Sequence, residues 1–204
     1  KLLEARQEDG AAAYAALAHD AKPLSFLSVE GAKDVGIEIH SFSKAYNMTG
    51  WRLAFVAGNE KIVAAYGHVK DNFDSGQFIA IQKAGIHALE HPEITDKISE
   101  KYKRRLKLMV EALQACGFSA VMPRGSFYLY VGAPKKAQKT NTVFNNAEEV
   151  SEYFIKEAHI STVPWDDEGQ YLRFSATFMA KNKDDEYRVI EEMKKRLKAL
   201  ELQF

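Results

Sequence analysis

The sequence lacks the features expected of a secreted, membrane-spanning or nucleic-acid-binding protein. It contains one cysteine, Cys116, which excludes an intrachain disulfide and a cysteine-rich metal site. No apolar run approaches the roughly 20 residues that a transmembrane helix needs, and no secretory signal is visible. The 28 basic and 28 acidic residues cancel, so net charge favours neither a nucleic acid nor an anionic membrane. We therefore expect a cytoplasmic protein with no nucleic-acid or membrane partner.

Several catalytic signatures are also missing. The sequence has no Gly-x-Ser-x-Gly elbow, no Gly-x-x-x-x-Gly-Lys loop and no Gly-x-Gly-x-x-Gly turn. Of its six histidines only His87 and His91 share a helical spacing, and Pro92 interrupts that helix, so no metal site is predicted. The basic run KYKRRLK at 101–107 lies in a helical pattern, and we expect it to form a solvated face.

The chain is long enough for one large domain or two small ones, and hydrophobic periodicity predicts alternating strands and helices. Alternation at 36–42 and an apolar run at 51–58 predict two strands, the second covered on both faces. Asp74 and Ser75 are candidate caps for a helix that runs to Leu89. The remaining pattern predicts a helix at 59–72, a helix at 91–117 with Pro92 in its first turn, a strand at 126–132, a loop at 133–146, a helix at 147–158, strands at 160–165 and 170–177, and a final helix that reaches Leu200.

The stretch SFSKAYNMTGWR at 41–52 is the most informative part of the chain. It places Lys44 among Ser41 and Ser43, with Gly50 and Arg52 following at fixed spacing. This string resembles the cofactor-lysine motif of the class I/II, fold-type I, pyridoxal-phosphate aminotransferases. The longer texts at 22–59 and 69–93 are most similar to the LL-diaminopimelate aminotransferase branch, and the resemblance covers about residues 12–204.

The resemblance implies a pyridoxal 5′-phosphate enzyme that exchanges an amino acid with a 2-oxo acid, through a Schiff base on Lys44. Ser41, Ser43 and Arg52 would hold the cofactor phosphate, for which arginine supplies a planar fork of donors. Gly50 would allow the backbone to bend close to the cofactor. In the diaminopimelate branch, which belongs to lysine biosynthesis, glutamate and 2-oxoglutarate would pair with LL-diaminopimelate and tetrahydrodipicolinate.

Other positions match the family singly. Tyr14 matches the tyrosine that meets the 3′-oxygen of the cofactor, although a core aromatic is the alternative. Arg173, between Leu172 and Phe174, matches the arginine that binds the substrate α-carboxylate. Independently of the resemblance, an arginine in such an apolar strand needs an anionic partner, which a structural carboxylate could also supply. In PRGSFYLYV, Gly125 is expected to serve the geometry of a turn.

Two departures from the family pattern limit the prediction. The aspartate that pairs with the pyridine nitrogen is replaced by Ala11, and Asp9 stands at the wrong offset. The family's first half, with its other phosphate-binding groups and central strands, does not precede Tyr14. We therefore expect an α/β fold made of the C-terminal part of the PLP-dependent transferase large domain, residues 1–90 with an atypical head at 1–11, followed by a complete small α/β domain at 91–204.

Three functions remain open at this point. The first is transamination, with the chain acting as a partial enzyme, in a homodimer or with a complementing chain. The second is a non-catalytic, aminotransferase-derived binding or regulatory fragment, which the change at Ala11 favours and the retained Lys44 opposes. The third is a PLP-dependent β-lyase of the same fold, although Gly-Trp-Arg is more similar to the aminotransferases.

Overall fold

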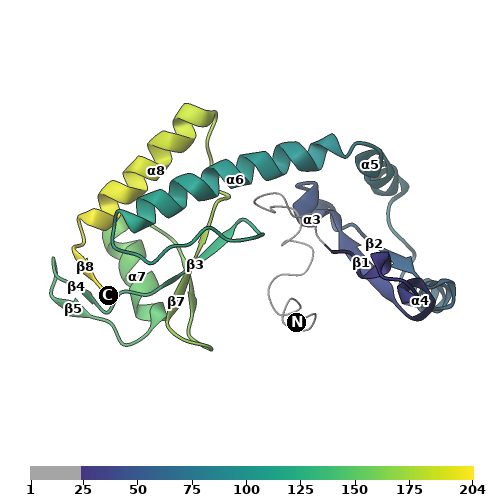
Figure 1. The fold of residues 1–204 in the computed structure, drawn as a ribbon, viewed down its shortest axis with the longest axis horizontal. Coiled ribbons are helices and arrows are strands. Elements are labelled where there is room, and N and C mark those ends of the chain that lie inside the picture. Colours follow the sequence, from purple (N-terminus) through teal and green to yellow (C-terminus); the bar gives the residue numbers. More distant parts are fainter. Residues whose placement is uncertain (1–23) are drawn as a thin grey trace. The chain divides into compact units, whose positions relative to one another are not determined.

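The computed structural model describes residues 24–204, so the predictions made at Asp9, Ala11 and Tyr14 lie outside the described residues. The chain divides into two compact units (Figure 1). Of the described residues, the first unit contains 24–100 together with Arg124–Ser126, and the second contains Lys101–Pro123 and Phe127–Phe204. The division falls inside a helix that begins at Glu93, and the assignment of 1–90 and 91–204 to a large and a small domain stays a prediction.

The first unit is built on an antiparallel strand pair. Strands Ile37–Ser41 (β1) and Ala54–Gly58 (β2) pair from Ile37 opposite Gly58 to Ser41 opposite Ala54. The other elements of this unit are Phe26–Ser28 (η2), Ala32–Val35 (α2), Phe42–Ala45 (α3), Thr49–Trp51 (η3), Glu60–Phe73 (α4) and Ile79–Glu90 (α5). The second strand thus begins at Ala54 and not at Trp51, and it is half-buried or exposed where the sequence predicted cover on both faces.

A small apolar core holds α5 against the strand pair. It consists of Phe42, Met48, Leu53 and Ala88, which are all buried. Gly85 permits this close packing, because a Cβ at that position would lie 2.5 Å from the Cδ2 atom of Leu53. The segment 42–53 is therefore fixed by hydrophobic packing as well as by strand pairing.

The predicted cap of the next helix is wrong. Asp74 follows the end of α4, where its carboxylate accepts a 2.6 Å bond from Lys70 Nζ and a 2.7 Å bond from the Gly76 amide. Helix α5 instead follows Phe78, which provides no side-chain cap. The Asp74 carboxylate thus forms an i, i+4 ion pair with Lys70, one turn earlier, and does not cap α5.

Glu38 ties the segment before β1 to the strand itself. Its carboxylate accepts hydrogen bonds from Ser25 Oγ at 2.7 Å and the Leu27 amide at 3.3 Å, and it lies 2.8 Å from His40 Nε2. Burial raises the pKa of the Glu38 carboxyl, but these hydrogen bonds outweigh it and hold the pKa below its ordinary value.

The second unit contains two small antiparallel sheets and three long helices. The elements are Glu93–Gln114 (α6), of which the residues from Lys101 belong to this unit, Tyr128–Gly132 (β3), Lys136–Ala137 (β4), Thr142–Val143 (β5), Ala147–Ala158 (α7), Val163–Trp165 (β6), Tyr171–Ser175 (β7), Lys183–Lys198 (α8) and Leu202–Gln203 (β8). One sheet has the strand order β3-β7-β6, and the other has the order β5-β4-β8. Helix α7 packs on β6 and β7, and α6 lies beside α8 (Figure 1).

The segment predicted as a loop, 133–146, contains strands β4 and β5. Lys136 pairs with both Val143 and Gln203, so the hairpin is completed by the last residues of the chain. Helix α6 begins at Glu93, so Pro92 lies immediately before it and not in its first turn, where the sequence predicted it. Within the described residues no helix is both long and apolar enough to cross a bilayer.

The basic run at 101–107 is a solvated face only in part, which corrects the prediction: Lys107 is exposed, but Arg105 is buried. Arg105 is only 3% exposed, and its Nε atom donates to Glu186 Oε1 over 2.8 Å. Arg104 donates to the other oxygen of the same carboxylate, also at 2.8 Å. Burial raises the pKa of Glu186, but the hydrogen bonds from the two arginines lower it by more than burial raises it, so the pKa lies below its ordinary value. The two arginines therefore join α6 to α8.

Candidate active site

The predicted lysine lies in a short helix at the end of β1. Ser41 closes the strand and caps α3, because its Oγ atom accepts a 3.1 Å hydrogen bond from the Ser43 amide. Phe42 points into the core and is 3% exposed, while Ser43 and Lys44 are half-buried. The alternation of a buried aromatic with serines thus anchors the backbone and leaves the polar side chains outside the core.

Strand pairing brings Arg52 to the same place. The Phe42 amide donates to the Leu53 carbonyl oxygen over 3.1 Å, which continues the β1–β2 register by one residue and sets Arg52 beside the start of α3. The turn between them is closed by Thr49, whose Oγ1 atom donates to the Ser43 carbonyl oxygen at 2.8 Å. Strand pairing therefore brings Arg52 close to the segment that contains Ser41, Ser43 and Lys44.

Arg52 adopts a left-handed backbone conformation, with φ of 54°. A non-glycine residue in this region costs on the order of 1–2 kcal/mol, so it persists only where neighbouring contacts impose it. Its Nη1 atom donates to the Thr49 carbonyl oxygen at 3.0 Å, and no carboxylate from residues 24–204 pairs with it. The guanidinium is exposed and keeps donors for an anion.

The donor set of this cluster fits a phosphate group. Ser41 and Ser43 offer hydroxyls, Arg52 offers a planar fork of N–H groups, and Lys44 offers a primary amine beside them. The space beside Gly50 is empty of described atoms, because a Cβ added there would meet none within 4 Å. Tyr14, the remaining predicted cofactor residue, lies outside the described part of the chain.

Arg173 lies in the second unit, on the central strand β7. It is half-buried, and its guanidinium carbon lies 4.3 Å from the centre of the Tyr128 ring. In the part of the chain that the structure describes, no carboxylate pairs with it, so the structural partner that the sequence left open is not found there. As far as residues 24–204 are concerned, the donor edge of Arg173 is available to an anionic ligand. The contact of Arg173 with Tyr128 was not predicted from the sequence. The alternation in SFYLYV places Tyr128 and Tyr130 on one face of a strand, but it does not show which residue of another strand they contact.

The turn before β3 carries its strain at an unpredicted residue. Ser126, which directly follows Gly125, is buried and has φ of 71°. Its side chain is small enough for this conformation, which a larger residue would adopt at greater cost.

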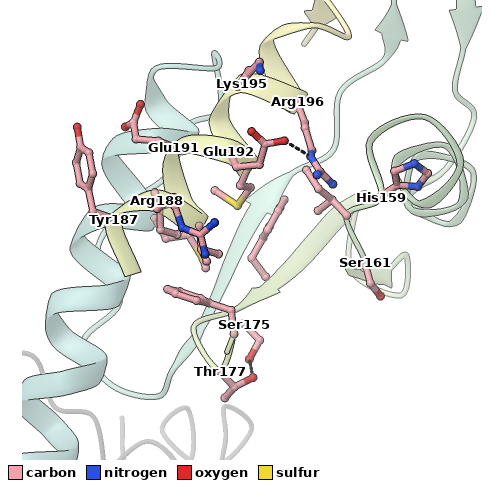
Figure 2. A pocket seen from close by; sticks show the side chains of 17 residues that line it. His159, Ser161, Ser175, Thr177, Tyr187, Arg188, Glu191, Glu192, Lys195 and Arg196 are labelled. Carbon is pink, nitrogen blue, oxygen red and sulfur yellow. Dashed lines mark hydrogen bonds and ion pairs between the residues drawn. The ribbon is translucent and has the colours of Figure 1, made fainter. Parts of the chain in front are cut away.

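An open groove of about 1250 Å³ lies elsewhere on the second unit (Figure 2). It is bordered by α8, by the end of β7 and by His159–Ser161 after α7. Lys44, Arg52 and Arg173 do not line it. Its arginines are already occupied: Arg188 pairs with Asp185, and Arg196 pairs with Glu192 at 2.8 Å. The groove is therefore not the predicted site.

Comparison with known proteins identifies the class to which this chain belongs. The family model for aminotransferase class I and II matches residues 12–189, and the chain therefore belongs to that family. It is 59% identical over 201 residues to the LL-diaminopimelate aminotransferase of Methanocaldococcus jannaschii, with 95% of this chain and 48% of the relative covered. It is 60% identical over 198 residues to the protein of the same name from Methanococcus maripaludis, with 95% and 47% covered.

Solved structures agree with the sequence comparison. The apo-BacF structure from Bacillus subtilis superimposes with a TM-score of 0.78 at 33% identity, over 93% of this chain and 48% of that one. The chain thus spans about half the length of the relatives it matches, and the match falls on their C-terminal half. The predicted α/β class and the C-terminal part of an aminotransferase are confirmed.

Proposed function

We propose that this chain carries the lysine, the phosphate-binding side chains and the carboxylate-binding arginine of a pyridoxal 5′-phosphate-dependent transamination. The observation that supports it is the cluster of Ser41, Ser43, Lys44 and Arg52, which two paired strands and a buried Phe42 hold together. When bound, pyridoxal phosphate supplies an aldehyde that exchanges amines and a ring that withdraws electrons from the substrate α-carbon.

Each residue of the chain has a separate task in this proposal. Lys44 would hold the cofactor through its Nζ atom and would serve as the general base that takes the proton from the substrate α-carbon. Ser41, Ser43 and Arg52 would bind the cofactor phosphate. Arg173 binds the substrate α-carboxylate through its N–H edge.

The names of two relatives support a proposal for the substrates. Two proteins named LL-diaminopimelate aminotransferase are 59% and 60% identical to this chain, and on that basis we propose LL-diaminopimelate and 2-oxoglutarate as the amino acid and 2-oxo acid.

The surface of the first unit supports an association with further polypeptide. On helices α4 and α5 and the segment between them, Val69, Phe73, Phe78 and Ile79 are each at least 67% exposed. Apolar side chains gathered in this way mark interaction surfaces in soluble proteins. We propose that a second copy or a complementing chain covers them.

The test is cofactor binding by the parent chain, by Lys44→Ala and by Lys61→Ala, an exposed lysine of α4 that serves as the control. We expect the parent and Lys61→Ala to give a visible absorption band with pyridoxal phosphate that Lys44→Ala lacks. Borohydride reduction followed by peptide mass spectrometry should place the added mass on residue 44. An added mass spread over many lysines, with equal spectra for all three proteins, would refute the assignment and favour the non-catalytic reading.

A further inference from the structure

The sheet β3-β7-β6 has one buried and one open face. Along β3 and β7 the side chains that enter the core are Leu129, Val131, Leu172 and Phe174, each at most 3% exposed. The alternate positions, Tyr128, Tyr130, Arg173 and Ser175, belong to the opposite face and are half-buried or exposed. Arg173 is thus placed on the open face by the same alternation that buries its two neighbours.

Arg173 is held on this face by an aromatic ring. In the strand register Arg173 lies opposite Tyr130, while Tyr128 lies opposite Ser175. The guanidinium nevertheless leans along the strand to the diagonal neighbour, with its carbon 4.3 Å from the centre of the Tyr128 ring. A guanidinium that stacks on a ring satisfies its flat face and leaves its N–H groups, which lie in the plane, for a ligand.

The stack addresses the main difficulty of using an arginine to bind a carboxylate. Its long side chain has many rotamers, and the entropy of fixing them opposes binding. The ring restricts those rotamers before the ligand arrives, so less order has to be gained on binding. Since no carboxylate in residues 24–204 pairs with Arg173, the ring is the contact that the structure shows for its guanidinium.

We propose that Tyr128 is a positioning residue for substrate binding: its ring orients the Arg173 guanidinium toward the substrate carboxylate. This inference rests on the proposed function, because it takes Arg173 as the carboxylate-binding residue. The phenol oxygen has no part in it, so phenylalanine should replace Tyr128 and an aliphatic residue should not.

The experiment measures 2-oxoglutarate affinity by calorimetry for the full chain and for four variants. Tyr128→Phe should bind like the parent, whereas Tyr128→Leu should bind about tenfold more weakly, the size expected for loss of one partly desolvated cation–π contact. Arg173→Lys should lose binding. Tyr130→Leu is the matched control, because Tyr130 lies on the same face and strand and packs edge-on against Trp165.

A second measurement reports the stack without a ligand. Ring current from Tyr128 should shift the Arg173 Nε–H proton upfield in the NMR spectra of the parent and of Tyr128→Phe, and the shift should vanish in Tyr128→Leu. This signal is independent of cofactor loading and of activity. It also shows whether the leucine variant is folded, because the other amide resonances should keep their positions.

The outcomes separate the two claims. If Arg173→Lys binds 2-oxoglutarate as well as the parent does, or if the parent fails to bind it at millimolar concentration, the assignment of Arg173 is wrong and the inference falls with it. If Arg173→Lys loses binding but Tyr128→Leu does not, only the positioning role is overturned. Equal losses in Tyr128→Leu and Tyr130→Leu would likewise overturn it, since the effect would then belong to the whole face.

Discussion

Replacing Glu186 by glutamine removes the charge that joins α6 to α8. The carboxylate is 3% exposed and accepts bonds from Arg105 Nε at 2.8 Å, from Arg104 Nε at 2.8 Å and from Arg104 Nη2 at 3.1 Å. Arg105 is buried to the same degree, so the substitution leaves its charge without a counter-charge away from water.

The magnitude follows from which contacts survive. Removing one partner of a buried ion pair costs about 3–5 kcal/mol. Arg105 keeps its Nη1 bonds to the carbonyl oxygens of Ala176 at 3.1 Å and Phe178 at 2.7 Å, and its guanidinium carbon stays 4.4 Å from the Phe178 ring centre. The lower end of the range, about 3 kcal/mol, therefore applies to Glu186→Gln. For a chain of this size that loss lowers the melting temperature by roughly 6–12 °C.

The assay follows thermal unfolding of the whole chain through a fluorescent reporter in the second unit. The sequence has two tryptophans, Trp51 in the first unit and Trp165 in the second, so a Trp51→Phe background leaves Trp165 as the fluorescent reporter. Glu192→Gln is the control, because the Glu192–Arg196 pair also lies on α8 but is exposed, and we expect no measurable change. A Glu186→Gln protein that melts within about 2 °C of the control would refute the reasoning, since a loss that small means the arginine is solvated or rearranged.

Two further predictions concern the first unit. Gly58→Ala should lower the urea midpoint strongly, because a Cβ there would lie 2.5 Å from the Gly36 carbonyl oxygen at a φ of 139°. At Gly85 the added Cβ would crowd the end of the Leu53 side chain, at 2.5 Å, and would lie in ordinary contact with the Phe42 ring, at 3.4 Å, so Gly85→Ala should lower the midpoint less. Equal losses would contradict this. Because hydrogen bonds depress the pKa of Glu38 in the folded state, its contribution is complete above the ordinary carboxyl pKa and is lost as the pH falls through the depressed value. Glu38→Gln should therefore show a flatter loss of stability than the parent in urea titrations between about pH 5 and 3, and identical slopes would count against the carboxylate contacts.

Local signals in the sequence determined several elements closely. The helix predicted at 147–158 is observed as Ala147–Ala158, because Asn146 caps its first turn through a 2.8 Å bond to the Glu149 amide and its apolar residues repeat at helical spacing. The spacing of Ser41, Ser43, Lys44 and Arg52 predicted a cofactor site only through its resemblance to the family motif; the pairing of β1 with β2 brings Arg52 back beside the start of α3. Such features depend on residues a few positions apart, which periodicity and caps report directly.

Tertiary structure decided what depends on distant residues. The sequence predicted a solvated basic run, but Arg105 is buried because Glu186, far along the chain, supplies its counter-charge. Strands β4 and β5 lie in a segment predicted as a loop, and their sheet is completed by β8 at the C-terminal end of the described chain. The lean of Arg173 toward Tyr128, and not toward Tyr130 opposite it, is a choice of rotamer and register. Charge burial, strand partners and rotamers are set by contacts between residues that are distant in the sequence, and for that reason no local sequence pattern predicts them.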